Sequence, residues 1–258
     1  MRKRYTEGFL SGTVICIHGL SSSANVFENL LLEEDFPFSR ITIELPGHGA
    51  QACQDSHVDY TIQSQVKQLT SLINEIDDDV LLVGNSYGGH LAIEVSQSIA
   101  RLKGLVICGT PPLSKPANFE EAFIPIPALN TFMTEQSSEK AVNEASEATV
   151  FNKNLVPQVT RYFKEADPAV RGALVKTLEN GDFSNQASIF KFLKVPKFII
   201  IGDHDLSINP DYLKNIAEHA VPPCKIINFE KCGHYPSLDR PTLFVNSLKN
   251  IAHKVFTP

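Results

Sequence analysis

The chain has 258 residues, 43% of them hydrophobic and 20% charged, with a formal net charge of −6. This length suits one α/β domain with a large core, and the acidic balance argues against binding nucleic acid or an anionic membrane surface, which require clustered Lys and Arg. The one basic cluster, Arg2 to Arg4, is expected to keep a flexible end of the chain solvated.

The composition also argues against secretion, membrane insertion and a bound metal. No apolar run of signal-peptide length follows the basic start, and no stretch approaches the 18 apolar residues of a membrane helix. The cysteines are odd in number and lack zinc-type spacing, at Cys16, Cys53, Cys108, Cys224 and Cys232. We therefore expect a cytoplasmic monomer or homodimer without a cofactor, a metal, or a nucleic-acid or membrane partner.

Short apolar runs recur along the chain and alternate with helical patterns. The runs cover residues 13–17, 41–43, 80–83, 105–108, 197–201 and 225–229. They are apolar throughout, which is typical of parallel strands buried on both faces. Helical spacing of apolar residues covers 61–76, and helices are also expected at 89–101 and 243–255. This alternation predicts an α/β fold with a doubly wound, mostly parallel sheet.

Residues 113–194 interrupt this alternation. The stretch has no convincing strand, is punctuated by prolines, and has helical patterns over 143–148, 159–166 and 170–178. It is too long for a loop. We predict a helical cap at 113–194, inserted after the strand at 105–108, on a core formed by 1–112 and 195–258.

Gly84-Asn85-Ser86-Tyr87-Gly88 fits the pattern G-x-S-x-G between a buried strand and a helix. In this context the serine occupies a strained turn with positive φ, and small residues on either side relieve crowding. The helix N-terminus then favours negative charge that develops beside the serine. Ser86 is therefore the candidate nucleophile; the alternative is a glycine-rich turn with an incidental serine.

A serine nucleophile needs a base, and His234 follows the last predicted strand. The chain order nucleophile, acid, histidine favours His234, with His204 as a minor rival. The other histidines are expected in structural, oxyanion-loop, helical or surface positions: His18, His48, His57, His90, His219 and His253.

The acid that orients this histidine should follow the strand at 197–201, where Asp203 and Asp205 both qualify. We favour Asp205 as the acid and keep Asp203 as the alternative. If Asp203 is not the acid, it is expected to be a solvated loop carboxylate or a turn cap. The two backbone N–H donors of the oxyanion hole are expected at Leu20 and Tyr87. The serines at 21–23 are also expected to cap a helix N-terminus.

Taken together, the motifs resemble those of the α/β-hydrolase superfamily over nearly the whole chain. They are His18-Gly19, Leu45-Pro46-Gly47-His48-Gly49, Gly84-x-Ser86-x-Gly88-Gly89, Gly202-x-x-Asp205 and Gly233-His234. A closer likeness, to a bacterial metal-independent N-acyl-homoserine lactonase of this fold, is found over 102–112, 21–23, 167–171 and 185–186. The chain departs from that lactonase at Leu20, Tyr87 and Asp205, where the lactonase has a polar residue, a tryptophan and a glutamate.

The expected reaction is hydrolysis of a carboxylic ester or lactone, possible substrates including an N-acyl-homoserine lactone. An apolar lining for an acyl chain is expected from Phe119, Phe123, Ile124, Ile126, Phe132 and Phe151, although some of these side chains only pack the cap onto the core. Thioesterase, amidase and carbon–carbon bond hydrolase activities use the same machinery and stay open. A receptor or scaffold that kept the fold is the alternative from another class.

Overall fold

A single seven-stranded sheet organises the protein in the computed structural model, which describes residues 1–49 and 58–257. The strand order is β1-β3-β2-β4-β5-β6-β7, and every pairing is parallel except that of β1 with β3. The strands are β1 (Arg2–Thr6), β2 (Leu10–Ile17), β3 (Phe38–Glu44), β4 (Val80–Asn85), β5 (Leu102–Cys108), β6 (Lys197–Gly202) and β7 (Cys224–Phe229). The predicted mostly parallel sheet and all six of its predicted strands are therefore confirmed.

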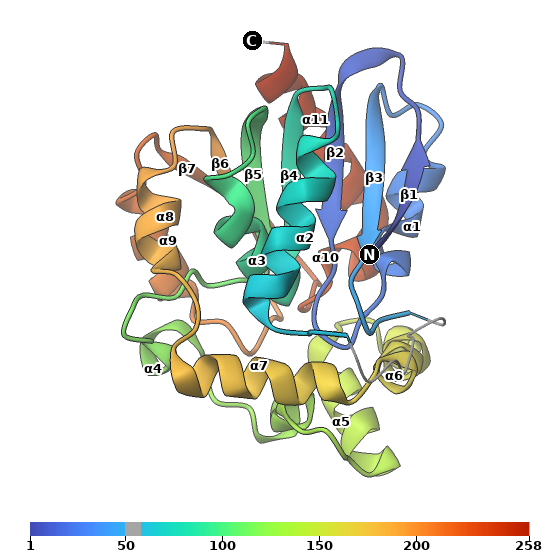
Figure 1. The fold of residues 1–258 in the computed structure, drawn as a ribbon. Coiled ribbons are helices and arrows are strands. Elements are labelled where there is room, and N and C mark those ends of the chain that lie inside the picture. The colour runs from blue at the N-terminus through green and yellow to red at the C-terminus, as the bar shows by residue number, and fades with distance from the viewer. Residues whose placement is uncertain (50–57, 258) are drawn as a thin grey trace.

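Both faces of the sheet are buried along its central strands, β2 to β6, as the unbroken apolar runs predicted. Successive side chains of a strand point to opposite faces, so along β2 Ile15 joins one core cluster and Cys16 the other. The first cluster packs under α2 (Ile62–Asn74), α3 (Tyr87–Ser96), α8 (Gln186–Phe192) and α9 (Pro210–Glu218). The second packs under α1 (Glu28–Leu32), α10 (Pro236–Asp239) and α11 (Pro241–Phe256), and Figure 1 shows the sheet between these two helix layers.

The chain between β5 and β6 contains most of the remaining helices. These are α4 (Phe119–Ala122), α5 (Glu139–Thr149), α6 (Val156–Glu165), α7 (Ala169–Asn180) and the 3₁₀ turns η2 (Pro127–Met133) and η3 (Lys153–Leu155). Figure 1 shows α4 to α7 gathered beyond one end of the strands. The three predicted helices lie within α5, α6 and α7, apart from one residue. By contrast, α8 falls inside the predicted range 113–194 but contacts α3 in the helix layer; the division into core and cap stays a prediction.

The N-terminal segment differs from its prediction as a flexible end. Arg2–Thr6 forms β1, which pairs antiparallel with β3 at the sheet edge. Four of its five residues are exposed, so the strand has no apolar pattern that the sequence could reveal. Arg4 also donates a hydrogen bond to the Ala24 carbonyl. This prediction was wrong because backbone pairing, rather than side-chain burial, places the strand.

No helix within residues 1–49 and 58–257 is long and apolar enough to cross a membrane. Cys16, Cys108, Cys224 and Cys232 are free thiols, and Cys53 lies outside the described residues.

Candidate active site

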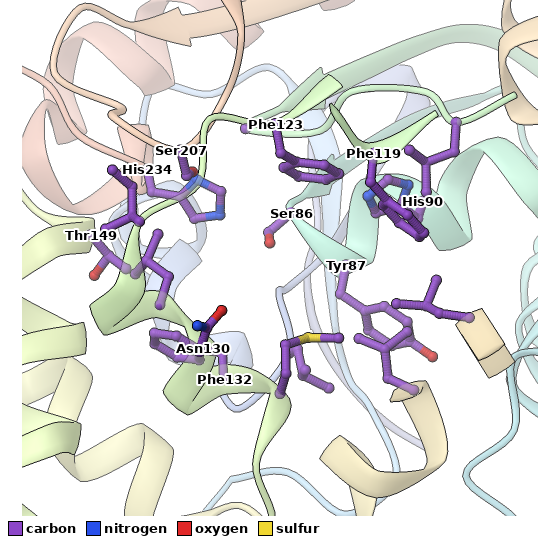
Figure 2. Close-up of a pocket in the computed structure, with 18 of the residues that line it drawn as sticks. Ser86, Tyr87, His90, Phe119, Phe123, Asn130, Phe132, Thr149, Ser207 and His234 are labelled. Carbon is purple, nitrogen blue, oxygen red and sulfur yellow. The ribbon is translucent and has the colours of Figure 1, made fainter. Parts of the chain in front are cut away.

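The strand ends and the α4–α7 segment enclose a largely apolar cavity of about 400 Å³. Ser86, Tyr87, His234 and Leu20 all line it. Figure 2 shows the Ser86 hydroxyl pointing into this space, with His234 on one side and Tyr87 and His90 on the other. Parallel strands end at the same edge of a sheet, which is why loops distant in sequence meet here.

Ser86 occupies a sharp turn between β4 and α3. Its φ of 53° and ψ of −122° are strained for a residue with a side chain, and its N–H donates to the Cys108 carbonyl at 2.8 Å. The flanking glycines make this turn sterically feasible. A Cβ on Gly88 would lie 2.2 Å from the carbonyl oxygen of Ile17, and one on Gly84 would lie 2.4 Å from the Gly88 oxygen.

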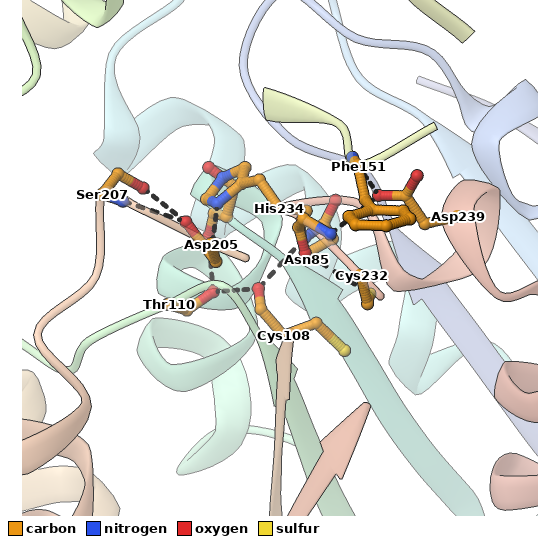
Figure 3. Close-up of polar contacts among 11 residues, drawn as sticks. Asn85, Cys108, Thr110, Phe151, Asp205, Ser207, Cys232, His234 and Asp239 are labelled. Carbon is orange, nitrogen blue, oxygen red and sulfur yellow. Dashed lines mark hydrogen bonds and ion pairs between the residues drawn. The ribbon is translucent and has the colours of Figure 1, made fainter. Parts of the chain in front are cut away.

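Asp205 and His234 form a buried pair. His234 Nδ1 lies 2.7 Å from Asp205 Oδ2, with side chains 14% and 5% exposed. The other carboxylate oxygen accepts hydrogen bonds from Ser207 Oγ at 2.7 Å and Ser207 N at 3.2 Å (Figure 3). Burial acts to raise the pKa of Asp205, but the charge of His234 and these hydrogen bonds hold it below its ordinary value. Burial acts to lower the pKa of His234, and Asp205 outweighs it and raises that pKa.

The backbone around His234 is fixed by the C-terminal end of α5 and by the last residue of β4. The His234 N–H donates to the Thr149 carbonyl at 2.7 Å, and Asn85 Nδ2 donates to the His234 carbonyl at 2.9 Å. Gly109, with φ +56°, lies against the pair: a Cβ there would be 2.8 Å from His234 ring atoms and 3.3 Å from Asp205 Oδ2. Ser86 and His234, both among the described residues, border the same cavity without a direct hydrogen bond. Such contacts often tighten only when substrate binds.

The loop after β2 brings Gly19 against Ser86, where a Cβ on Gly19 would lie 3.1 Å from the Ser86 Cβ, and Leu20 lines the same cavity. Ser21, with φ 52°, turns the chain there, and its N–H donates to His48 Nε2 at 3.0 Å. Ser21 Oγ accepts a hydrogen bond from Arg171 Nη1 of α7 at 3.0 Å. Ser23 caps the 3₁₀ turn η1 (Ala24–Phe27), as the sequence predicted. The loop is therefore held from both the core and the helices above it.

His48 serves this loop as a neutral acceptor. Burial, followed by the nearby His18, lowers its pKa to about 3. Because its Nε2 accepts from Ser21, its Nδ1 must carry the proton that is shared with the Pro46 carbonyl at 2.9 Å. His18 is fully buried behind the same loop, with Nδ1 2.8 Å from the Gly19 oxygen and Nε2 2.9 Å from Glu44.

Comparison with known proteins decides the family. The family model described as the alpha/beta hydrolase family matches residues 14–247. The chain belongs to the alpha/beta hydrolase family.

Two curated relatives and one solved structure show what the chain is similar to. A pimeloyl-[acyl-carrier protein] methyl ester esterase of Nitrosomonas europaea is 24% identical, over 90% of this chain and 92% of its own. A cis-3-alkyl-4-alkyloxetan-2-one decarboxylase of Shewanella oneidensis is also 24% identical, over 92% and 80%. The solved structure of a mutant of the N-acyl homoserine lactonase AidH, complexed with N-hexanoyl homoserine lactone, superposes with a TM-score of 0.85 at 22% identity, over 99% of this chain and 94% of its own.

In this hydrolase-family chain Asp203 and His204, the alternatives to Asp205 and His234, pair with each other. Asp203 Oδ1 lies 2.6 Å from His204 Nδ1, both side chains at least 41% exposed, and also accepts the Cys232 N–H. His219 is exposed, whereas His253 is half-buried against Phe38. His253 lies on α11, a helical position as expected, and is partly exposed. His57 lies outside the described residues.

The predicted apolar lining separates into two groups. Phe119, Phe123, Ile124, Ile126 and Phe132 line the cavity. Phe151 does not line it. The centroid of its ring lies 4.6 Å from that of His204, which pairs with Asp203. Other residues that line the cavity were not assigned to it from the sequence, namely Gly109, Leu113, Asn130, Thr149, Leu174, Leu178, Gln186 and Ser207. Ser207 had the best available signal, since a hydroxyl two residues after Asp205 can close a turn onto that carboxylate.

Proposed function

We propose that this chain is a serine hydrolase that cleaves a carboxylic ester or lactone through an acyl-enzyme intermediate. The observation that carries this proposal is the buried Asp205–His234 pair, bordering the same apolar cavity as Ser86. Ser86 is the nucleophile, His234 the general base and acid, and Asp205 the residue that orients the imidazole. No other histidine within the described residues combines a buried carboxylate partner with a place on this cavity wall.

The tautomer of His234 suits this role. Asp205 accepts the Nδ1–H, which leaves the Nε2 lone pair free to take the Ser86 hydroxyl proton as Oγ attacks the carbonyl carbon. The C–O bond to the leaving group then breaks, and Nε2 returns the proton to the departing oxygen. Water, deprotonated by the same Nε2, attacks the acyl-enzyme and releases the acid and Ser86.

Two backbone N–H groups, those of Leu20 and Tyr87, would bind the oxyanion. Both residues line the cavity beside Ser86, and Tyr87 opens α3, whose N-terminus favours negative charge. The fixed turn at Ser21 supports a preformed site, since His48 and Arg171 hold it in place before substrate binds.

The substrate proposal rests on the cavity lining. Phe119, Phe123, Ile126 and Phe132 offer an apolar surface for an acyl chain. An N-acyl-homoserine lactone is a specific candidate substrate, because this chain shares its fold with the lactonase AidH. The methyl ester esterase relative favours a simple acyl ester equally. Thioesters, amides and carbon–carbon bonds remain alternatives for the same residues, and the cytoplasmic location stays a prediction.

Labelling with a fluorophosphonate probe tests the reaction class. We expect stoichiometric modification of the folded protein and none of Ser86→Ala. A folded chain that resists the probe would instead support a receptor on the same fold. A chain-length series of p-nitrophenyl esters, measured beside acyl-homoserine lactones, then separates esterase from lactonase activity.

A further inference from the structure

His90 is a polar group in the cavity wall that the proposed reaction does not use. It lies one helical turn after Ser86 on α3, and its N–H donates to the Ser86 carbonyl at 3.2 Å. The imidazole lines the cavity. Figure 2 shows it on the opposite side of Ser86 from His234.

A chain of hydrogen bonds fixes the tautomer of His90. Glu94 Oε1 can only accept, so Gln186 must direct its amide nitrogen to it, at 2.9 Å. The Gln186 oxygen then faces His90 Nδ1 at 2.7 Å and also accepts the Leu113 N–H at 3.4 Å. His90 Nδ1 therefore carries the hydrogen, and Nε2 keeps a lone pair.

This lone pair has no protein partner in the described part of the chain. Figure 2 shows Phe119 beside His90, and the cavity lining is largely apolar, with Leu113, Leu178 and Phe183 among its residues. Burial also lowers the pKa of His90, which keeps the ring neutral and Nε2 an acceptor. An acceptor in apolar surroundings is costly to leave unpaired, so it selects ligands that bring a donor to it.

The position of His90 indicates which part of a substrate would meet it. This step rests on the proposed function: His234 must protonate the leaving oxygen, so the leaving group points toward His234. The acyl group then extends from Ser86 toward the opposite wall. Four residues of helix rise about 6 Å, which places a matching donor only a few bonds from the scissile carbonyl.

We propose that His90 Nε2 accepts a hydrogen bond from a hydroxyl or amide N–H on the acyl part of the substrate. The substrate class is then an ester or lactone whose acyl group carries a donor near the carbonyl, rather than a plain alkanoyl ester. His90 is in this role a specificity-determining residue, and the chain Glu94–Gln186 positions it.

Matched substrates test this. Methyl N-butanoylglycinate is compared with methyl butanoyloxyacetate, in which oxygen replaces the N–H, and methyl 3-hydroxyhexanoate with methyl hexanoate, all by methanol release. We expect kcat/KM to be about tenfold higher for the donor-bearing member of at least one pair, the value of one hydrogen bond. Equal rates within both pairs would overturn the inference while leaving the proposed hydrolase intact. Absence of turnover with all four esters, together with absence of probe labelling, would overturn both.

Two variants locate the effect at His90. His90→Leu should abolish the preference, so that the donor-bearing ester and its partner turn over at the same rate, and circular dichroism shows that the variant is folded. Gln186→Met removes the acceptor that fixes the His90 tautomer, so it should weaken the preference for the donor-bearing ester. Leu178→Ala, on the same wall, should change both members of a pair alike and keep their ratio. A preference that survives in both His90→Leu and Gln186→Met contradicts the role of His90.

Discussion

Gly109 lies where any side chain would disturb the Asp205–His234 pair. A Cβ would come within 2.8 Å of the imidazole at a φ of +56°. Because the pair would have to shift, Gly109→Ala should lower kcat about 10²-fold, the usual effect of a misplacement of about 1 Å. Stopped-flow or steady-state kinetics with a p-nitrophenyl ester measures this.

Gly181 provides the matched control. It also has a positive φ, +66°, but a Cβ there would meet nothing within 4 Å. Gly181→Ala should therefore cost roughly 1 kcal/mol of stability through backbone strain and leave kcat unchanged. If both alanine variants lose activity equally, backbone strain rather than contact with His234 explains the loss.

The residues of the proposed triad could be predicted because each follows a strand that its own sequence reveals. Ser86 and His234 come with local glycines, and Asp205 follows the run at 197–201. Gly109, His90 and Gln186 could not be predicted in the same way. Their roles depend on which side chains the fold brings against them, such as Glu94 on Gln186 and His234 on Gly109.

At the scale of secondary-structure elements, α7 is tied by one side chain to the loop after β2, which carries the proposed oxyanion donor Leu20. Arg171 is 2% exposed and donates to Ser21 Oγ, the Thr134 carbonyl and the Glu135 carbonyl. Its guanidinium lies 4.2 Å from the Phe163 ring centroid. Arg171→Met should leave these acceptors unpaired and lower stability by about 3 kcal/mol. Since the loop carries Leu20, kcat should also fall about tenfold with KM little changed.

Arg161→Met is the control, because Arg161 lies on α6 with a side chain 60% exposed and stacks on Tyr162. It should change neither stability nor kcat appreciably. Thermal unfolding and kinetics well below the melting temperature measure the two effects separately. A destabilised Arg171→Met with normal kcat would show that Arg171 only holds the helices together.

Two of the elements that sequence analysis missed share one physical cause. β1 and α4 lack an apolar periodicity of their own, since β1 is mostly exposed and α4 spans only Phe119–Ala122. Partners elsewhere in the chain hold them, as β3 holds β1. The strands β2 to β6 could be predicted because burial on both faces leaves a continuous apolar run in the sequence. The edge strand β7 is only partly buried, but its sequence keeps Ile226, Ile227 and Phe229.

Over the whole molecule, buried histidines make stability sensitive to mild acid. The pKa of His48 falls to about 3 in the folded chain against 6.5 as the ordinary value, so between these pH values only the unfolded chain takes up the proton. Stability therefore decreases as pH falls, by about 1.4 kcal/mol per pH unit for one such group. His90, whose pKa is also lowered, adds in the same direction.

The other shifted groups of the site do not obscure this window. His234, with its raised pKa, is protonated in both states below 6.5. Asp205 and Glu44, with lowered pKa values, lose their contribution only below their ordinary values of 3.8 and 4.5. Denaturant unfolding at pH 6.5 and 5.0 should show a smaller loss in His48→Gln, which keeps an acceptor for Ser21. If the unmodified protein and His48→Gln lose the same stability between these pH values, groups other than His48 cause the acid sensitivity.

The hydrogen bond from Asn85 to the His234 carbonyl spans 149 residues. β7 is the edge strand and pairs only with β6, so the loop after it reaches Ser86 only once β5 and β6 have docked. Closing so long a loop is entropically costly and slow. During refolding, probe labelling should thus return after the circular dichroism of the sheet. In a partly folded chain Ser86 would have no base beside it, and it should become reactive only when β7 has docked and His234 is in place.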